Sequence, residues 1–343
     1  MGKAMCSSAS QERTEEVSRI GNLFDTFSVE ERQRIKGVTD TLIELLEEWS
    51  RQYPSVRTTR TAAVALLSAT VAPRMPVTAS LLLSKFAQWL FGVDDRADER
   101  LVSLAELEQK VEQWRSMAND GPSNEIDNDE LSLMLLEIRE ELSTFPLFEP
   151  LREWWSSEVA RLVEAMVQEY WNGVQYRTNG TDALPSLGKY VNCGLYSIGV
   201  TPWAIAVLIV LDDPSVEKHL DLIGEAVKNA SAAVRLYNDL RSYDKEVRKE
   251  NTINSITVTY FAIRGENPHA NEEEVLSKAS RHVLQLADSY AQKCYNVFKQ
   301  FQTESGQFEQ IISRMVAFHR YFYREIGDYH TTSQDKAHKM LSI

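Results

Sequence analysis

The chain has 343 residues, of which 43% are hydrophobic and 25% charged, a composition typical of a soluble globular protein with a large core. Its net charge of −13 argues against a nucleic-acid-binding protein, because binding a phosphate backbone requires a basic face. A polyanionic ligand would need a cation between itself and this protein.

The cysteines and the apolar segments indicate a cytoplasmic protein without a membrane span. Cys6, Cys193 and Cys294 are too few for a disulfide framework and lack the spacing of a metal site. No apolar run reaches the roughly 18 residues that a membrane span needs, and the longest, residues 203–211, is expected to be a core helix. Residues 1–20 lack the apolar segment of a signal peptide and are expected to form a disordered tail.

Apolar residues recur with the period of an α-helix through most of the chain. In residues 38–49, for example, Leu42, Leu46 and Trp49 are three or four positions apart. The same pattern follows in residues 81–90, 111–117, 131–142, 151–171 and 279–301. Prolines and glycines separate these segments, and no shift in composition marks a second domain. The sequence therefore predicts an all-α helical bundle in a single domain over residues 21–335, with residues 336–343 as a C-terminal tail.

Acidic residues gather at the end of the apolar helix expected over residues 81–90. The stretch FGVDDRADER places Asp94, Asp95, Asp98 and Glu99 there. Like charges three and four positions apart repel each other, and the helix dipole disfavours negative charge at a helix C-terminus. A solvated acidic helix end is one explanation. A divalent cation that cancels the repulsion is the other, and the apolar helix that precedes the cluster favours it.

A second group of oxygen-bearing side chains lies in the stretch YNDLRSYDKE. Asn238, Ser242 and Glu246 are four positions apart, so on a helix they form one stripe of about 12 Å. Amide, hydroxyl and carboxylate oxygens suit Mg²⁺, which prefers octahedral oxygen ligands. The simpler interpretation is a polar helix face whose serine bonds back to its own backbone. The acidic cluster at residues 94–99 favours metal binding over that interpretation.

DDRADE and NDLRSYDKE, in this order, resemble the paired metal motifs of class I terpene cyclases of the bacterial and fungal type. NTINSI, which follows the second motif, also fits that family. KYVNCGLYSIGVTPW resembles a segment of cyclooctatenol-type diterpene cyclases. The resemblance extends over residues 35–335. It implies an all-α bundle around a deep apolar pocket, with the two motifs facing each other across the mouth of the pocket.

The resemblance also implies a substrate, a cofactor and roles for individual residues. The substrate is a prenyl diphosphate, geranylgeranyl or farnesyl, with geranylgeranyl slightly favoured, and three Mg²⁺ ions bridge it to the two motifs. The expected metal ligands, which are also the expected catalytic residues apart from Asp95, are Asp94, Asp95, Asp98, Asn238, Ser242 and Glu246. Lys245 is expected to contact the diphosphate. Phe91, Tyr196 and Trp203 are expected to face the pocket, where aromatic rings stabilise a carbocation; core packing is the alternative for these three.

One departure from the family pattern concerns an arginine that contacts the diphosphate. The family places it four or five residues after the tyrosine that matches Tyr190, where this chain has Gly194 and Leu195. Arg177 and Lys189 are candidates to replace it.

A second departure lies near the C-terminus, where the family carries an Arg-Tyr pair. This chain has Lys336 and Ala337 at that place, while Arg320 and Tyr321 lie nearer the expected distance from the second motif but in a different context. Ionisation triggered by metal alone, or a substrate already cyclised by another enzyme, is therefore a further possibility.

Two other functions share a helical bundle. A trans-prenyltransferase normally carries two Asp-rich motifs, and the Asn/Ser/Glu stripe speaks against it. A catalytically inactive helical binding module is the alternative from a different class, and the missing arginine keeps it open. One chain reveals no dimer interface, so a monomer and a homodimer are both open.

Replacing Asp94 or Asn238 with alanine is expected to abolish turnover of a prenyl diphosphate, because each change removes an oxygen ligand of the expected metal ions. The far-UV circular dichroism of both variants should match that of the wild type. Loss of the helical signal would instead assign these residues a structural role.

Overall fold

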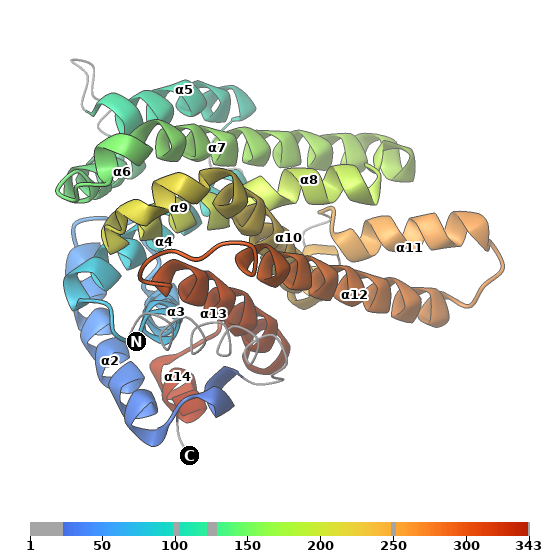
Figure 1. Cartoon of the computed structure of the whole chain (residues 1–343). Helices are drawn as coiled ribbons and strands as arrows, with labels where there is room; N and C mark the ends of the chain where they lie inside the picture. Colours follow the sequence, from blue (N-terminus) through green and yellow to red (C-terminus); the bar gives the residue numbers. More distant parts are fainter. Residues whose placement is uncertain (1–22, 99–102, 122–128, 248–251, 342–343) are drawn as a thin grey trace.

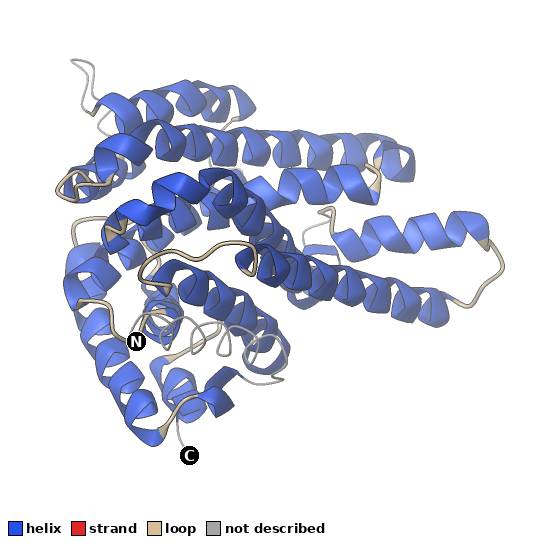
Figure 2. Cartoon of the chain, in the orientation of Figure 1, coloured by secondary structure: helices blue, strands red, loops and turns tan. Residues whose placement is uncertain are grey.

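The computed structural model describes residues 23–98, 103–121, 129–247 and 252–341, and these fold into helices joined by short turns, with no strand among them (Figure 2). The predicted all-α fold is thereby confirmed, while the tail expected at residues 1–20 lies outside the described residues. In chain order the α-helices are α2 (Val29–Ser50), α3 (Thr61–Val71), α4 (Val77–Asp98), α5 (Leu104–Asp120), α6 (Glu130–Leu142), α7 (Phe148–Asn179), α8 (Leu187–Ser197), α9 (Val200–Leu211), α10 (Leu220–Lys245), α11 (Ser255–Glu266), α12 (Glu272–Phe298), α13 (Gln307–Tyr321) and α14 (Gln334–Leu341). A π-helical turn, η6 (Phe322–Ile326), extends α13.

Capping residues start several of these helices. At α2, Ser28 accepts a hydrogen bond from the backbone N–H of Glu31, and the Glu31 carboxylate accepts one from the N–H of Ser28. Ser103 and Glu106 form the same reciprocal box at the start of α5. Each cap satisfies N–H groups that the helix itself cannot, which stabilises a helix by about 1 kcal/mol. Local sequence thus determines where these helices begin.

The apolar helix α9 lies in the core of the bundle, and every residue from Val200 to Ile209 is buried. The longer segment Leu187–Leu211 is apolar and long enough to cross a membrane by length and composition, but 78% of its most apolar window is buried inside the fold. Gly199, with a φ of 74°, also interrupts this segment between α8 and α9. The segment is therefore part of the protein core.

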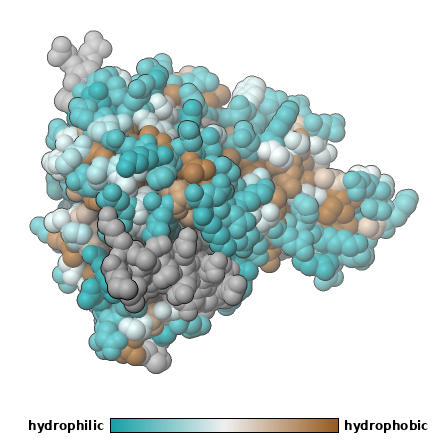
Figure 3. All heavy atoms as spheres, viewed as in Figure 1, coloured by the Kyte–Doolittle hydropathy of each residue, from teal (hydrophilic) through white to brown (hydrophobic). Residues whose placement is uncertain are grey.

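The other helices pack around this core (Figure 1). α10 packs along α12, and α5 packs along α7, while α11 and α12 project together from one side of the molecule (Figure 1). The outer helices are amphipathic: α12 buries Val275, Ala279, Val283 and Ala287, which are four positions apart. The face in Figure 3 is largely hydrophilic, with hydrophobic residues in patches, as the amphipathic pattern requires.

Asp129 connects the three helices α4, α5 and α6. Its carboxylate caps α6 by accepting from the N–H of Leu131 at 3.1 Å, and it forms ion pairs with Arg96 of α4 at 2.7 Å and Lys110 of α5 at 3.0 Å. Burial alone would raise the pKa of Asp129, but hydrogen bonds from Ser132 and Lys110 and the nearby Arg96 and Lys110 charges lower it to about 2. This carboxylate holds the C-terminal half of α4, which carries the acidic motif.

The C-terminal residues 336–341 are not the tail that the sequence predicted. They belong to α14, which packs against α2 and α3 with Ala337 and Leu341 buried. His338 also contacts Asp40 of α2. The helix is only eight residues long and buries just two side chains completely, so its periodicity in the sequence is too weak to identify.

Replacing Asp129 with asparagine should destabilise the protein at pH 7 by about 2 kcal/mol, since the lowered pKa measures the preference of the fold for the charged form. This stabilisation is fully present above the unfolded pKa of 3.8 and is lost as the pH falls towards the folded value of about 2. Urea unfolding at several pH values measures the difference in the free energy of unfolding between the wild type and the variant. At pH 3 this difference should be about half of its value at pH 7. A free-energy difference that does not change with pH would contradict the lowered pKa of Asp129.

Candidate active site

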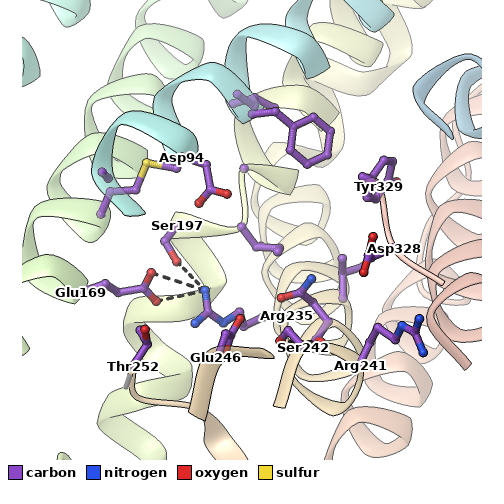
Figure 4. Close-up of a pocket in the computed structure, with 18 of the residues that line it drawn as sticks. Asp94, Glu169, Ser197, Arg235, Arg241, Ser242, Glu246, Thr252, Asp328 and Tyr329 are labelled. Carbon is purple, nitrogen blue, oxygen red and sulfur yellow. Dashed lines mark hydrogen bonds and ion pairs between the residues drawn. The ribbon is translucent and has the colours of Figure 1, made fainter. Parts of the chain in front are cut away.

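A cavity of about 660 Å³ lies among α4, α7, α8, α9, α10 and α13. Part of its wall is apolar and is formed by Leu90, Met166, Val200, Trp203, Val234 and Met315. The rest of the wall carries carboxylates, amides and cations, most of them from α4, α7 and α10 (Figure 4). A cavity with one apolar and one polar wall suits a ligand that has a hydrocarbon part and an ionic part.

The two motifs, far apart in the sequence, meet at this cavity. Asp94 projects from α4, while Ser242 near the end of α10 and Glu246 directly after it project towards the same space (Figure 4). Asn238 of α10 lines the same cavity. Asp94 follows Leu90 by four positions, so both lie on the same face of α4. The convergence that the sequence predicted is thus present in the structure.

Hydrogen bonds orient the side chains of the second motif. The Ser242 hydroxyl donates to the backbone carbonyl of Asn238 at 3.0 Å, as the simpler interpretation of the motif expects, and this leaves the lone pairs of its oxygen available. The amide of Asn254 donates to the Glu246 carboxylate and to the Asp239 carbonyl, both at 2.9 Å. Asn254, which belongs to the NTINSI segment, is fully buried and also caps α11.

Negative charge is unfavourable at two positions of this cavity. Burial raises the pKa of Asp94 to about 6; Arg60 opposes the shift, and Asp95 and Glu169 add to it. Burial and the nearby carboxylate of Asp239 raise the pKa of Glu246 to about 7. A bound cation would relieve the cost of ionising both carboxylates.

The available donors fit a magnesium ion better than a transition metal. Among the described residues, no three His, Cys, Asp or Glu side chains form a cluster that could hold an ion. The cavity instead offers carboxylate, amide and hydroxyl oxygens, the hard ligands that Mg²⁺ binds while it keeps positions for water or phosphate oxygens.

The two other aspartates of the first motif are placed differently. Asp95 does not line the cavity; its carboxylate pairs with Arg60 at 2.5 Å and with Arg57 at 3.1 Å. Adjacent residues on a helix point about 100° apart, which explains why Asp94 and Asp95 face different surroundings. Asp98 is the last residue of α4, and its side chain lies outside the described part of the chain. Metal binding by Asp95 and Asp98 stays a prediction.

Two of the three expected aromatic residues line the cavity. The indole N–H of Trp203 donates to the backbone carbonyl of Leu83 at 3.2 Å, which fixes the orientation of its ring. Phe91 also lines the cavity, but the guanidinium of Arg60 already lies 4.7 Å from its ring centre, and Tyr329 packs against it with ring centres 4.7 Å apart. Trp203 is therefore the ring more available to a cationic ligand.

The third aromatic residue lies outside the cavity wall. The centre of the Tyr196 ring on α8 lies 5.9 Å from Cζ of Arg161 on α7. Tyr196 does not line the cavity, so the expected pocket-facing position is not observed. α8 turns only part of its circumference towards the cavity, and Tyr190, Cys193 and Ser197 occupy that part. Helical periodicity alone could not identify which face that would be.

The basic residues that we expected from the sequence to contact the diphosphate form two groups, those that line the cavity and those that do not. Lys245 and Arg177 line the cavity. Arg320 pairs with Asp288 of α12 at 2.8 Å and does not line the cavity, and Lys336 donates to the carbonyl of Thr331 at 2.9 Å, also outside the cavity wall. Lys189 is not part of the wall either.

Several residues of the cavity wall were missed by the sequence analysis. They are Glu169 of α7, Arg235 of α10, His319 of α13 and the segment 328–330. Arg235 precedes Asn238 by three positions, so helical spacing could have identified it. The others reach the cavity through the tertiary arrangement of α7, α13 and the loop after η6, which no local pattern indicates.

Comparisons with known proteins agree with this geometry. The family model described as terpene synthase family 2, C-terminal metal binding, matches residues 85–286. No curated protein matches the chain in sequence. Similar solved structures include the SVS_A2 protein from ancestral sequence reconstruction, with 17% identity and a TM-score of 0.65 over 84% of this chain and 85% of that one.

Two further solved structures come from Streptomyces. The 2-methylisoborneol synthase from Streptomyces coelicolor A3(2), in complex with Mg²⁺ and geranyl-S-thiolodiphosphate, has 14% identity and a TM-score of 0.66 over 84% of this chain and 91% of that one. The germacradien-4-ol synthase from Streptomyces citricolor has 12% identity and a TM-score of 0.63 over 84% of this chain and 93% of that one. At such identities these structures show a common fold. Because the family model covers more than half of the chain, the protein belongs to terpene synthase family 2 and has the all-α fold of class I terpene synthases.

Proposed function

We propose that this terpene synthase ionises a linear prenyl diphosphate and cyclises it to a terpene hydrocarbon or alcohol, with release of diphosphate. The observation that carries this proposal is a single cavity in which Asp94, Asn238, Ser242 and Glu246 adjoin an apolar wall. Its volume of about 660 Å³ is typical of a pocket that encloses a whole small ligand. Geranylgeranyl diphosphate is the preferred substrate, given the diterpene-cyclase likeness of residues 189–203, and farnesyl diphosphate is the shorter alternative.

Magnesium binding by the two motifs explains how a protein of net charge −13 takes up an anion. Asp94 on one side, and Asn238, Ser242 and Glu246 on the other, are the proposed ligands, and three ions per site are expected. When bound, the ions supply positive charge that stabilises the diphosphate as a leaving group. The raised pKa values of Asp94 and Glu246 support this assignment, since both carboxylates need a cation to ionise at little cost.

The side chains of the protein then bind the two ends of the substrate. Lys245 adds a cation at the polar wall, while the apolar wall holds the prenyl chain away from water. After the allylic C–O bond breaks, the fixed ring of Trp203 stabilises the carbocation through its π face. The Phe91 ring adds to this stabilisation through the part of it that Arg60 does not cover. Burial lowers the pKa of His319 to about 4, so this histidine in the wall is neutral at pH 7 and does not repel the carbocation.

A cytoplasmic location completes the proposal. Of the described cysteines, Cys193 and Cys294 are both free thiols, which suits a reducing compartment.

Incubation of the purified protein with Mg²⁺ and each linear prenyl diphosphate should give a cyclic terpene, most efficiently from geranylgeranyl diphosphate. Gas chromatography with mass spectrometry of the organic extract detects it, and a parallel reaction with a chelator should give none. A longer diphosphate would indicate a prenyltransferase, and a product from a cyclic diphosphate alone would indicate a substrate prepared by another enzyme. All diphosphates left intact would indicate an inactive binding module.

The variant Asp94→Asn should retain the fold, with a melting temperature at pH 8 without magnesium equal to or above that of the wild type. The folded pKa of about 6 lies above the value of 3.8 for a free aspartate, so the charged form at pH 8 disfavours the folded state. Addition of Mg²⁺ with inorganic diphosphate should raise the melting temperature of the wild type and leave that of the variant nearly unchanged.

The matched control for this measurement is Asp335→Asn, which changes an exposed carboxylate on α14. Mg²⁺ with inorganic diphosphate should raise the melting temperature of this variant as much as that of the wild type. Stabilisation of Asp94→Asn to the same extent would remove Asp94 from the metal site.

A further inference from the structure

Arg235 is a cation of the cavity wall that lies outside both metal motifs. Its side chain leaves α10 one turn before Asn238 and is only 13% exposed. Its Nη2 donates to the hydroxyl of Tyr190 at 2.6 Å, and its Nε lies 3.0 Å from a carboxylate oxygen of Asp239. These two contacts are short and tie the guanidinium to α8 and to its own helix.

The contacts of the other terminal nitrogen of Arg235 are longer. Nη1 lies 3.2 Å from one carboxylate oxygen of Glu169 and 3.3 Å from the hydroxyl of Ser197, and it faces the cavity between Asp94 and Glu246 (Figure 4). A fully formed hydrogen bond is shorter than these Nη1 contacts, so Nη1 has donor capacity for an anionic ligand in the cavity.

The charge of Arg235 persists despite its burial. Burial lowers the pKa of the guanidinium, but the carboxylates of Glu169, Asp239 and Glu246 together with Tyr190 outweigh burial and raise it well above its usual value. Arg235 also lowers the pKa of both Asp94 and Glu246, so it interacts with the carboxylates of both motifs. A permanent positive charge thus lies next to both halves of the proposed metal site.

The stem of Arg235 occupies the space beside Gly194. A Cβ atom placed on Gly194 would lie 2.8 Å from Cγ of Arg235, closer than real Cβ contacts, and 3.2 Å from its Nε, which is a tight contact. Any side chain at position 194 would therefore displace Arg235. Position 194 is one of the two at which the family resemblance expects an arginine and this chain has none. An arginine on α8 at this position and Arg235 on α10 would compete for the same space.

We infer that Arg235 is the arginine that contacts the leaving diphosphate in this protein, reaching from α10 the space that Gly194 leaves open on α8. The inference rests on the proposed function. Nη1 exchanges its long contacts with Glu169 and Ser197 for diphosphate oxygens, while Tyr190 and Asp239 keep the guanidinium in place. When the allylic C–O bond breaks, its electron pair leaves with the bridging oxygen, and the N–H groups of Arg235 stabilise the resulting charge.

The alternative is a structural role, in which Arg235 only ties α7, α8 and α10 together. That role predicts a loss of stability when Arg235 is replaced, but no specific loss of diphosphate affinity. Calorimetric titration with inorganic diphosphate in the presence of Mg²⁺ separates the two roles and does not depend on turnover. The matched control is Arg320→Met, because Arg320 is also ion-paired and partly buried but lies outside the cavity wall.

Arg235→Met should fold and bind inorganic diphosphate at least about tenfold more weakly than the wild type, since a charge-assisted contact is lost. Gly194→Ala should also weaken binding, because the added Cβ displaces Arg235. The double variant Gly194→Arg with Arg235→Ala moves the arginine to α8 and should recover affinity to within about threefold of the wild type. Arg320→Met should bind as the wild type does.

The inference is overturned if Arg235→Met binds inorganic diphosphate as tightly as the wild type does. It is also overturned if the wild type does not bind diphosphate. If Arg235→Met does not fold, the double variant decides: diphosphate binding supports the inference, and failure to bind or to fold assigns Arg235 a structural role. Turnover separates this inference from the proposed function. Diphosphate binding that depends on Arg235, in a protein that converts no prenyl diphosphate, contradicts the proposed function alone.

Discussion

The site depends on two carboxylates whose ionisation is less favourable in the fold than it is in water. Asp94 and Glu246 come from helices far apart in the sequence and face one cavity, where burial raises the pKa of both. Arg235 is close enough to both to lower the pKa of each, yet both values stay raised. Such strain is typical of functional sites, and a ligand that brings positive charge between the carboxylates would relieve it. Magnesium with a diphosphate, as proposed, would satisfy both the carboxylates and the cations around them.

The rest of the fold holds these charges in place. Asp129 fixes the C-terminal half of α4 against α5 and α6, and thereby the position of Asp94. Asn254 holds the carboxylate of Glu246 and the end of α10 while it caps α11. The buried helix α9 supplies Trp203 to the apolar wall. The polar ends of α4 and α10 and the apolar core are therefore parts of one arrangement, which suits a ligand that has a hydrocarbon chain and an ionic head group.

Helical periodicity predicted the all-α fold. Motif spacing predicted the acidic group at residues 94–99 and the stripe of Asn238, Ser242 and Glu246, because each of these is local to one helix. Periodicity could not place α14, which is short, or show that Tyr196 faces Arg161 instead of the cavity. The orientation of a helix about its axis depends on its neighbours, which spacing within the helix does not encode. The side chain of Arg235 on α10 occupies the space beside Gly194 on α8. This contact between two helices depends on their packing, so the sequence alone could not predict it.

A crystal structure with Mn²⁺ in place of Mg²⁺ and with inorganic diphosphate tests whether the two motifs bind shared metal ions, because manganese is identified by its anomalous scattering. Anomalous peaks are expected within about 2.3 Å of oxygens of Asp94 and of the group formed by Asn238, Ser242 and Glu246. The diphosphate should lie between the two sets of ligands. Peaks at other side chains, or a diphosphate bound away from this cavity, would contradict shared metal binding by the two motifs.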